Sequence, residues 1–185
     1  MLALLTLIQF VFTFCVDFKT QVGQITVQVN ETWAPLGAQR FKTLVDQKFY
    51  EDSAFFRVVP NFVVQFGISG YPKINEIWGN NTIPDDPVLV SNLKGTVSYA
   101  TAGPNTRTTE LFINTVDNPR LDASGFAPFA KVVKGFEHVN QIVNPTPGNK
   151  MGIDQDKYSS FGNRWIRAHY PNVTFIQHVK YVKCP

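Results

Sequence analysis

Apolar and polar residues alternate along several short stretches of the chain, which is the period of a β-strand with one buried face. Residues 23–29 (GQITVQV) place an apolar side chain at every second position, and a further strand is expected over residues 173–182. Two more strand-like runs, 96–100 and 111–114, flank a polar loop whose Gly-Pro-Asn sequence is a strong turn signal. The pattern therefore predicts many short strands.

Other stretches change to the 3.6-residue spacing of a helix. Residues 34–49 begin near Pro35, which suits a first helical turn, and continue with apolar residues on one face. Those apolar residues are Phe41, Leu44, Val45 and Phe49. Residues 135–143 predict a shorter helix that Pro145 stops, and residues 163–169 predict another turn or two. Periodicity alone also allows a β-sandwich with accessory helices.

Length and charge indicate one ordinary globular domain. The chain has 185 residues, enough to bury most of its apolar surface around a single core. Its net charge is +3 and its lysines and arginines form no run, so we expect no nucleic-acid partner. The histidines match no metal-site motif, and we expect Asp85 and Asp86, between two prolines, to form an extended loop rather than a calcium site.

The first fifteen residues contain no charged side chain and are about as long as the hydrophobic region of a signal peptide. Thr13 and Cys15 are small residues that could precede a cleavage site. We therefore expect residues 1–15 to be a signal peptide and residues 16–185 to form the domain, with no stable membrane association after cleavage. The protein would then be secreted or reside in the ER lumen. A buried N-terminal strand or an uncleaved membrane anchor is the alternative.

Three Asn-x-Ser/Thr sequons support a secretory route, and we expect them to be glycosylation sites. They begin at Asn30, Asn80 and Asn172. Cleavage after Cys15 would leave Cys184 as the only thiol, which would rule out an intramolecular disulfide.

One segment, residues 55–67 (FFRVVPNFVVQFG), sets an arginine and a glutamine among aromatic and β-branched residues. If the turn between its two strands has three residues, 60–62, Arg57 falls opposite Gln65 and both side chains leave the same face. A two-residue turn would put them on opposite faces. Taken alone, the segment is also compatible with an edge-strand arginine whose head lies in water.

Three separated blocks together resemble one known family. In order, they are FFRVVPNFVVQFG, ATAGPNTRTTELFIN and LDASGFAPFAKVVKGFEHVNQI. Their order and spacing resemble the cyclophilin family of peptidyl-prolyl cis-trans isomerases over nearly the whole chain after the first two dozen residues. The resemblance implies a mainly β fold: a closed eight-stranded antiparallel barrel with a helix capping each end. It also implies an isomerase that needs no cofactor and no metal.

The same resemblance assigns roles to particular residues. Arg57 would be the donor that stabilises the twisted amide, and Gln65 would hold and orient it. The wall of the proline pocket would consist of Phe62, Val63, Phe112 and Leu121. The remaining substrate-binding positions would be Ala100, Thr101, Glu110 and Phe126. Without the family pattern, the apolar members of this set would be interpreted as ordinary core residues.

Several of these positions depart from the common family pattern. Val63 stands in place of methionine, Thr101 in place of asparagine, and Phe126 in place of histidine beyond a one-residue insertion. Glu110 replaces a glutamine, which puts a carboxylate in the groove.

Two of the departures lead to specific expectations. We hypothesise that Glu110 pairs with Arg57, which would either fix the arginine for catalysis or draw it away from the substrate. Arg120 occupies the usual tryptophan position, so an aromatic wall and an indole N–H donor are lost. The family generally uses this tryptophan to hold cyclosporin, and we therefore expect weak cyclosporin binding.

The expected partners are proline-containing peptides and client proteins, folded or unfolded, and we expect a monomer. Two other functions stay open. The chain could be a proline-peptide binding module on the same scaffold with weak or lost catalysis, or an extracellular adhesion or signalling domain in which the groove has no part.

Overall fold

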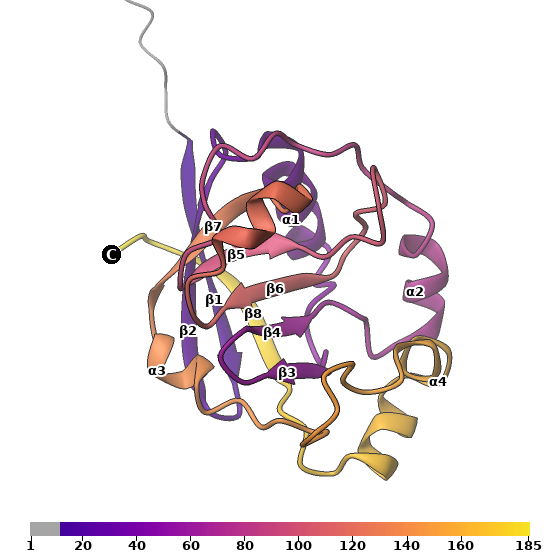
Figure 1. Ribbon diagram of the computed structural model, residues 1–185. Helices are drawn as coiled ribbons and strands as arrows, with labels where there is room; N and C mark the ends of the chain where they lie inside the picture. The colour runs from indigo at the N-terminus through magenta and orange to yellow at the C-terminus, as the bar shows by residue number, and fades with distance from the viewer. Residues whose placement is uncertain (1–11) are drawn as a thin grey trace, which may run out of the picture.

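The computed structural model describes residues 12–185, and its centre is one sheet of eight antiparallel strands (Figure 1). In chain order the strands are β1 (Thr13–Thr20), β2 (Gly23–Asn30), β3 (Arg57–Val59), β4 (Val63–Phe66), β5 (Thr96–Tyr99), β6 (Leu111–Asn114), β7 (Pro128–Lys134) and β8 (Ile176–Val182). Their order across the sheet is β3-β4-β6-β5-β7-β2-β1-β8. The mainly β, eight-stranded antiparallel architecture expected from the sequence is therefore confirmed.

The sheet is an open half-barrel, so the expectation of a closed barrel is wrong. It ends at β3 on one side and β8 on the other, and no ladder of paired residues joins these two strands. The segments just before them meet at a single bridge between Ala54 and Phe175. There, Phe55 N donates to Thr174 O over 3.0 Å. An antiparallel ladder that continued along β8 would need the residues before Ala54, and beyond the hydrogen bond from Ile176 N to Ser53 O, 2.8 Å, these residues form turns rather than a strand.

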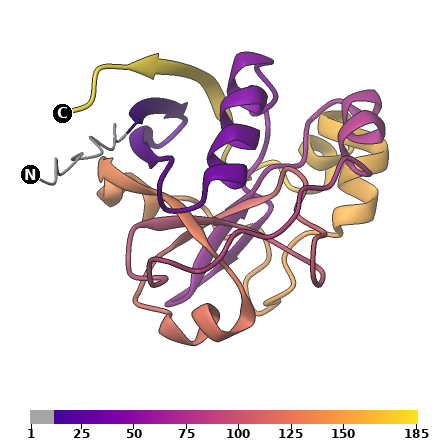
Figure 2. The same ribbon diagram turned by 90° about the horizontal axis from the view of Figure 1, so that it is seen from above.

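The helices differ from the expected pair of caps. They are α1 (Pro35–Asp46), α2 (Pro72–Trp78), the 3-10 helix η1 (Pro119–Ser124), α3 (Phe136–Val139) and α4 (Gln155–His169). The predicted first helix is confirmed as α1, whereas the predicted second helix is only the single turn of α3. The helix expected near the C-terminus is longer than predicted, and α2 was not predicted. Figures 1 and 2 both show α2 and α4 side by side at one side of the sheet.

The main core lies between α1 and the sheet. The ring of Phe41 on α1 lies 5.2 Å from the ring of Phe129 on β7 and 6.1 Å from that of Phe18 on β1, measured between centroids. A second, smaller cluster of buried apolar residues lies between α4 and the start of β3, and it includes Phe56, Ile153 and Tyr158. This second cluster holds the segment that leads into α4 against the strand that carries Arg57.

The N-terminal strand includes residues that the sequence analysis assigned to a signal peptide. Cys15 is 1% exposed within β1 and forms a disulfide with Cys184, which lies just beyond β8. The inference that the two cysteines cannot pair is therefore wrong, because β1 and β8 are neighbours and bring them together. Residues 13–15 begin β1, in which Thr13 is exposed, Phe14 is half-buried and Cys15 is buried, as the alternative of an N-terminal strand expects of Cys15. The remainder of the leader prediction, residues 1–11, lies outside the described residues.

The acidic pair at positions 85 and 86 lies in a loop, as expected, and Asp86 has a structural task. Its carboxylate accepts hydrogen bonds from Leu36 N at 3.0 Å and Gly37 N at 2.9 Å, at the start of α1. It also forms a buried ion pair with Arg107 at 3.0 Å. These contacts complete the N-terminus of α1, whose first amides have no partner within the helix.

Candidate active site

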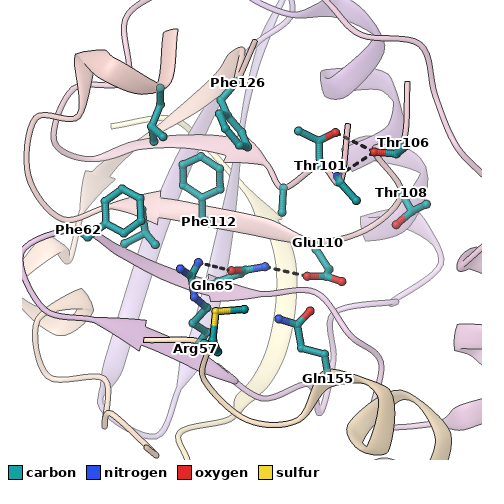
Figure 3. A pocket seen from close by; sticks show the side chains of 15 residues that line it. Arg57, Phe62, Gln65, Thr101, Thr106, Thr108, Glu110, Phe112, Phe126 and Gln155 are labelled. Carbon is teal, nitrogen blue, oxygen red and sulfur yellow. Dashed lines mark hydrogen bonds between the residues drawn. The ribbon is translucent and has the colours of Figure 1, made fainter. Parts of the chain in front are cut away.

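The residues that the sequence analysis assigned to the substrate groove all lie around one cavity of about 500 Å³ (Figure 3). The hairpin of β3 and β4 supplies Arg57, Phe62, Val63 and Gln65. The strand β6, the helix η1 and the loops next to β5, β6 and η1 supply the others, which are Ala100, Thr101, Glu110, Phe112, Leu121 and Phe126. Segments separated by up to seventy residues in sequence therefore meet in one place. The structure confirms that they are neighbours, while their roles in binding and catalysis stay predictions.

The hairpin of β3 and β4 has the three-residue turn on which the site depends. Arg57 pairs directly with Gln65, and Val59 pairs with Val63, so residues 60–62 form the turn. Asn61 adopts a positive φ of 56°, a conformation that asparagine tolerates better than most residues. Arg57 and Gln65 consequently leave the same face of the sheet, toward the cavity.

Two hydrogen bonds fix the guanidinium of Arg57. Its Nη1 donates to Gln65 Oε1 over 2.9 Å, and its Nε donates to the backbone oxygen of Lys150 over 2.7 Å. Its Nη2 makes no hydrogen bond with any residue between 12 and 185. Partial burial lowers the pKa of Arg57, and the negative charge of Glu110 opposes that effect. The arginine is thus held in place with one nitrogen available to a ligand.

The loop that supplies the Lys150 oxygen can approach Arg57 because it has a glycine at position 152. Gly152 has a φ of +80°, and a Cβ atom there would lie 2.7 Å from Arg57 Cβ and 2.8 Å from Phe56 O. Ile153 N also donates to Phe56 O over 2.9 Å, which ties the loop to the strand. A side chain at position 152 would push the loop and Arg57 apart.

We therefore expect Gly152→Ala to lower kcat/KM by about 10- to 100-fold, because a displacement of about 1 Å in a positioning contact can cost that much. The matched control is Gly148→Ala. Gly148 has a similar φ of +84°, but a Cβ atom there would meet nothing within 4 Å. Both variants carry backbone strain, and only the first displaces Arg57. Equal activity of the two variants in a peptide isomerisation assay would contradict this account.

Glu110 is linked to Arg57 through Gln65 rather than directly. Gln65 Nε2 donates to Glu110 Oε2 over 2.8 Å (Figure 3), and no ion pair joins Glu110 to Arg57. The hypothesis of a direct pair is wrong, because the glutamine amide occupies the space between the two charges. A carboxylate can only accept, so Glu110 turns the amide NH2 toward itself and the amide oxygen toward Arg57. Burial raises the pKa of Glu110, opposed by the hydrogen bond from Gln65 and the charge of Arg57.

One end of the cavity is apolar. The rings of Phe112 and Phe126 meet edge to face with centroids 5.5 Å apart, and Phe62, Val63 and Leu121 complete the wall. Phe112 is a buried strand residue, so it contributes both to the core and to the cavity wall. An aromatic and aliphatic wall of this kind suits a small saturated ring.

The other end is polar and includes residues that the sequence analysis did not identify. These are Ala102, Thr106 and Thr108 from the loop before β6, Met151 from the segment that leads into α4, and Gln155, the first residue of α4. Thr101 and Thr106 share a hydrogen bond of 2.8 Å between their hydroxyls. The two loop threonines follow the Gly-Pro-Asn turn signal and could have been suspected. Met151 and Gln155 carried no signal, because nothing in the sequence predicted which segment packs over Arg57.

Arg120 lies beside the apolar end, at the position where a tryptophan was expected from the family pattern. Its guanidinium carbon lies 4.8 Å from the centroid of the Phe62 ring, and the side chain is exposed. Arg57 approaches the same ring less closely, at 6.0 Å. The rim of this end is therefore charged where the common pattern has an aromatic wall.

Between residues 12 and 185, no group of three or more histidine, cysteine, aspartate or glutamate side chains is arranged to hold a metal ion. Within the same range, no helix is both long and apolar enough to cross a membrane.

Comparison with known sequences gives a consistent result. Residues 15–159 match the family model for the cyclophilin type peptidyl-prolyl cis-trans isomerase. A peptidyl-prolyl cis-trans isomerase of Acinetobacter baylyi is 33% identical over 155 residues, which are 76% of this chain and 77% of the relative. Peptidyl-prolyl cis-trans isomerase A of Dickeya dadantii is 33% identical over 128 residues, covering 66% of this chain and 67% of that protein.

Solved structures agree on the fold. A cyclophilin type peptidyl-prolyl cis-trans isomerase of Cryptosporidium parvum superimposes with a TM-score of 0.71 at 19% identity, over 94% of this chain and 100% of that one. A second structure of that protein, determined in the presence of the dipeptide Ala-Pro, gives a TM-score of 0.68. With a family model matching well over half of its length, this chain belongs to the cyclophilin-type peptidyl-prolyl cis-trans isomerases.

Proposed function

We propose that this protein accelerates cis-trans rotation about Xaa-Pro bonds in client proteins, folded or unfolded, with Arg57 as the donor that stabilises the twisted amide. The observation that carries the proposal is the fixed guanidinium at the edge of an apolar cavity. Gln65 and the Lys150 oxygen hold two of its nitrogens, and the third is available to a peptide carbonyl. This activity would assist protein folding, because unaided rotation about such bonds is slow.

The reaction places modest chemical demands on the site. The amide C–N bond resists rotation because it has partial double-bond character, with a barrier of about 18–20 kcal/mol. No covalent bond forms or breaks. The site has to hold the proline ring and to bind the twisted amide more tightly than either planar form. Each tenfold acceleration corresponds to about 1.36 kcal/mol of such preference.

Arginine can supply that preference. As the amide twists, conjugation is lost, electron density returns to the nitrogen, and the carbonyl is no longer held in the amide plane. A planar fork of permanently charged donors can hold the carbonyl oxygen and face the nitrogen lone pair. These hydrogen bonds are stronger in a partly dry groove than in water. The apolar end formed by Phe62, Phe112 and Phe126 would receive the proline ring, and Ala100 and Thr101 would contact the peptide backbone.

Exchange spectroscopy by NMR tests this proposal on a short Xaa-Pro peptide with the intact chain. Catalytic amounts of protein should produce exchange cross-peaks between cis and trans resonances at mixing times at which the free peptide shows none. The alternative, a proline-binding module with weak or lost catalysis, is motivated by the residues at positions 101, 110, 120 and 126. That alternative predicts shifted peptide resonances on titration without exchange.

We also propose that the protein works in the secretory pathway, either in the ER lumen or secreted. Disulfides persist in oxidising compartments, and the pair of Cys15 and Cys184 supports this location. The sequons at Asn80 and Asn172 begin at exposed residues, so both are open to glycan attachment. Asn30 is half-buried, and its side-chain oxygen accepts from both the backbone and the hydroxyl of Thr32.

Mass analysis of protein recovered from secreting cells tests this location. We expect glycan mass on the sequons and, after digestion without reductant, one peptide that contains both Cys15 and Cys184. Any leader cleavage should therefore occur before Cys15, since a cut after it would remove the first residues of β1 and half of the disulfide. A free thiol at Cys184 would contradict this expectation.

Weak cyclosporin binding is a further expectation from Arg120. The exposed guanidinium offers neither the flat apolar wall nor the single N–H donor of an indole. We expect Arg120→Trp to bind cyclosporin at least tenfold more tightly than the unchanged protein in a calorimetric titration. Tight stoichiometric binding by the unchanged protein would show that this position does not limit the interaction.

A further inference from the structure

The groove has two chemically different ends with an acidic residue at one of them. Figure 3 shows Phe62, Phe112 and Phe126 gathered at one end and the three labelled threonines at the other. Glu110 points into the polar end, and Gln155 projects toward the same region from the opposite side. A peptide whose proline ring fills the apolar end must place another part of its chain over Glu110.

The negative charge of Glu110 has no direct counter-charge. Among the residues that line the cavity, Glu110 is the single acid and Arg57 the single base. Gln65 lies between them and uses Glu110 Oε2, whereas Oε1 makes no hydrogen bond with any residue in the range 12–185. Arg57 is fixed on its own side by Gln65 and by the Lys150 oxygen. One carboxylate oxygen is thus available to a donor brought by a ligand.

On the side away from Arg57, the lining next to Glu110 contains a second acidic residue. Thr108, Glu110 and Gln155 line a second, adjoining cavity of about 190 Å³. The lining of that cavity includes Asp156 and contains no lysine, arginine or histidine. The Thr108 hydroxyl, which has no hydrogen bond to the described chain, offers a further acceptor. Arg40 lies behind this lining, where it is 9% exposed and its Nη1 donates to the backbone oxygen of Thr108 over 3.1 Å, but it lines neither cavity. A cation entering the polar end therefore meets the free oxygen of Glu110 and the Thr108 hydroxyl before any other cation.

We propose that Glu110 selects Xaa-Pro substrates that carry a lysine or arginine within about three residues of the proline. The inference rests on the proposed isomerase function of the same groove. An extended peptide advances about 3.3–3.6 Å per residue, so a side chain two or three positions from the proline can reach the opposite end of such a cavity. The long aliphatic stem would pack beside Met151, which is 74% exposed at the groove, while the cationic head reaches the carboxylate.

The desolvation of Glu110 favours the same outcome. Burial raises the pKa of this carboxyl, because the hydrogen bond from Gln65 and the charge of Arg57 do not fully replace the water that its charged form has lost. A cation brought by the substrate would stabilise the charged carboxylate. An acidic residue at the same peptide position would face repulsion from Glu110.

The test compares matched peptides that differ at one position. Lysine, its uncharged isostere norleucine, and glutamate are placed in turn at each of the three positions before and after the proline. For every peptide, kcat/KM is measured by NMR exchange with the intact chain. We expect one position at which the lysine peptide is about tenfold better than the norleucine peptide and the glutamate peptide is worse still.

Two variants assign the effect to Glu110. Glu110→Gln should bring the lysine-to-norleucine ratio close to one, whatever happens to the absolute rates, because the ratio cancels any loss from reorienting Gln65. Glu137→Gln is the matched control: it removes the same charge from the exposed surface of α3, outside the groove, and should leave the ratio unchanged. Raising the salt concentration should also reduce the ratio in the unchanged protein, which needs no variant.

The outcomes separate the two proposals. Exchange on every peptide with a lysine-to-norleucine ratio near one would overturn the assignment of Glu110 and leave the isomerase function standing. A lysine preference that survives Glu110→Gln would also overturn it. Absence of exchange on all peptides would instead overturn the proposed function itself.

Discussion

Arg57→Ala is expected to lower kcat/KM by about 10²- to 10³-fold, or roughly 2.7–4 kcal/mol, which is the usual effect of removing one preorganised donor from a catalytic site. The guanidinium is already held by Gln65 and the Lys150 oxygen before any substrate arrives. Little reorganisation is then needed when the amide twists. Peptide binding should weaken less than turnover, because the apolar end of the cavity does not depend on this side chain.

The appropriate control is Arg120→Ala. Both arginines approach the ring of Phe62, at 6.0 Å for Arg57 and 4.8 Å for Arg120, and both variants remove one positive charge. Arg120 lies outside the cavity lining, so its loss should change kcat/KM by less than about threefold if the local field alone is affected. A similar loss of kcat/KM in the two variants would mean that positive charge near the groove matters and that the fixed guanidinium of Arg57 has no special role.

Arg57→Lys tests whether the positive charge alone is sufficient for activity. A lysine retains the charge but has one donor group on a flexible stem, so it cannot contact Gln65, the Lys150 oxygen and a substrate together. We expect it to recover no more than a small part of the lost activity. Full recovery would show that charge alone is sufficient.

The hairpin shows why this site was predictable from sequence. Because side chains alternate along a strand, each possible turn length predicted a different placement of Arg57 and Gln65. The structure has the three-residue turn, which puts Arg57 opposite Gln65. The remaining groove residues were predicted from the resemblance of three sequence blocks to the cyclophilin family. Because each block supplies residues from a paired strand or an adjoining loop, their collection at one cavity follows from the fold.

The errors have physical causes that a single sequence does not reveal. The direct pair of Glu110 and Arg57 was inferred from opposite charges, and the register instead inserts Gln65 between them. α2 has only seven residues, of which Trp78 is the buried one, so the helix is too short to show a repeating pattern of apolar residues. α4 is interrupted at Gly162, whose φ of 63° divides the apolar pattern into two halves.

The loop that supplies the Lys150 oxygen to Arg57 was missed for a related reason. Met151, Gly152 and Gln155 reach the groove through tertiary packing of α4, and no local pattern signals that contact. The disulfide was missed because the first residues of β1, Thr13 to Cys15, are as free of charge as the residues before them and were assigned to the same leader. Only the pairing of β1 with β8 shows that Cys15 belongs to the domain.

Loss of the disulfide between Cys15 and Cys184 is expected to lower the free energy of unfolding by up to about 5 kcal/mol. The cysteines are 169 residues apart, and the chain-entropy model gives about that value for a loop of this length. Such a loss is a large part of the roughly 5–15 kcal/mol that stabilises an ordinary domain. The effect should be measured by urea unfolding of the protein with and without a reductant.

Cys184→Ser is the matched variant for this measurement. Cys184 lies beyond β8 and is partly exposed, whereas Cys15 is buried and a serine there would add the cost of an unpaired hydroxyl. The variant without reductant should unfold at the same urea concentration as the reduced, unchanged protein, and reductant should not destabilise it further. A midpoint that is insensitive to reductant in the unchanged protein would contradict the prediction.

The groove should remain active when the disulfide is absent, provided that the temperature stays below the lowered unfolding midpoint. β8 is an edge strand bound to β1, and its contact with α1 through Tyr181 and Asp46, 2.6 Å apart, does not depend on the cysteines. Arg57 lies on β3, at the other end of the strand order. Unchanged kcat/KM together with a lowered unfolding midpoint would therefore separate the role of the disulfide in stability from the role of the groove in catalysis. A parallel loss of activity in the folded, reduced protein would show instead that the edge at β8 supports the position of β3 across the bridge between Ala54 and Phe175.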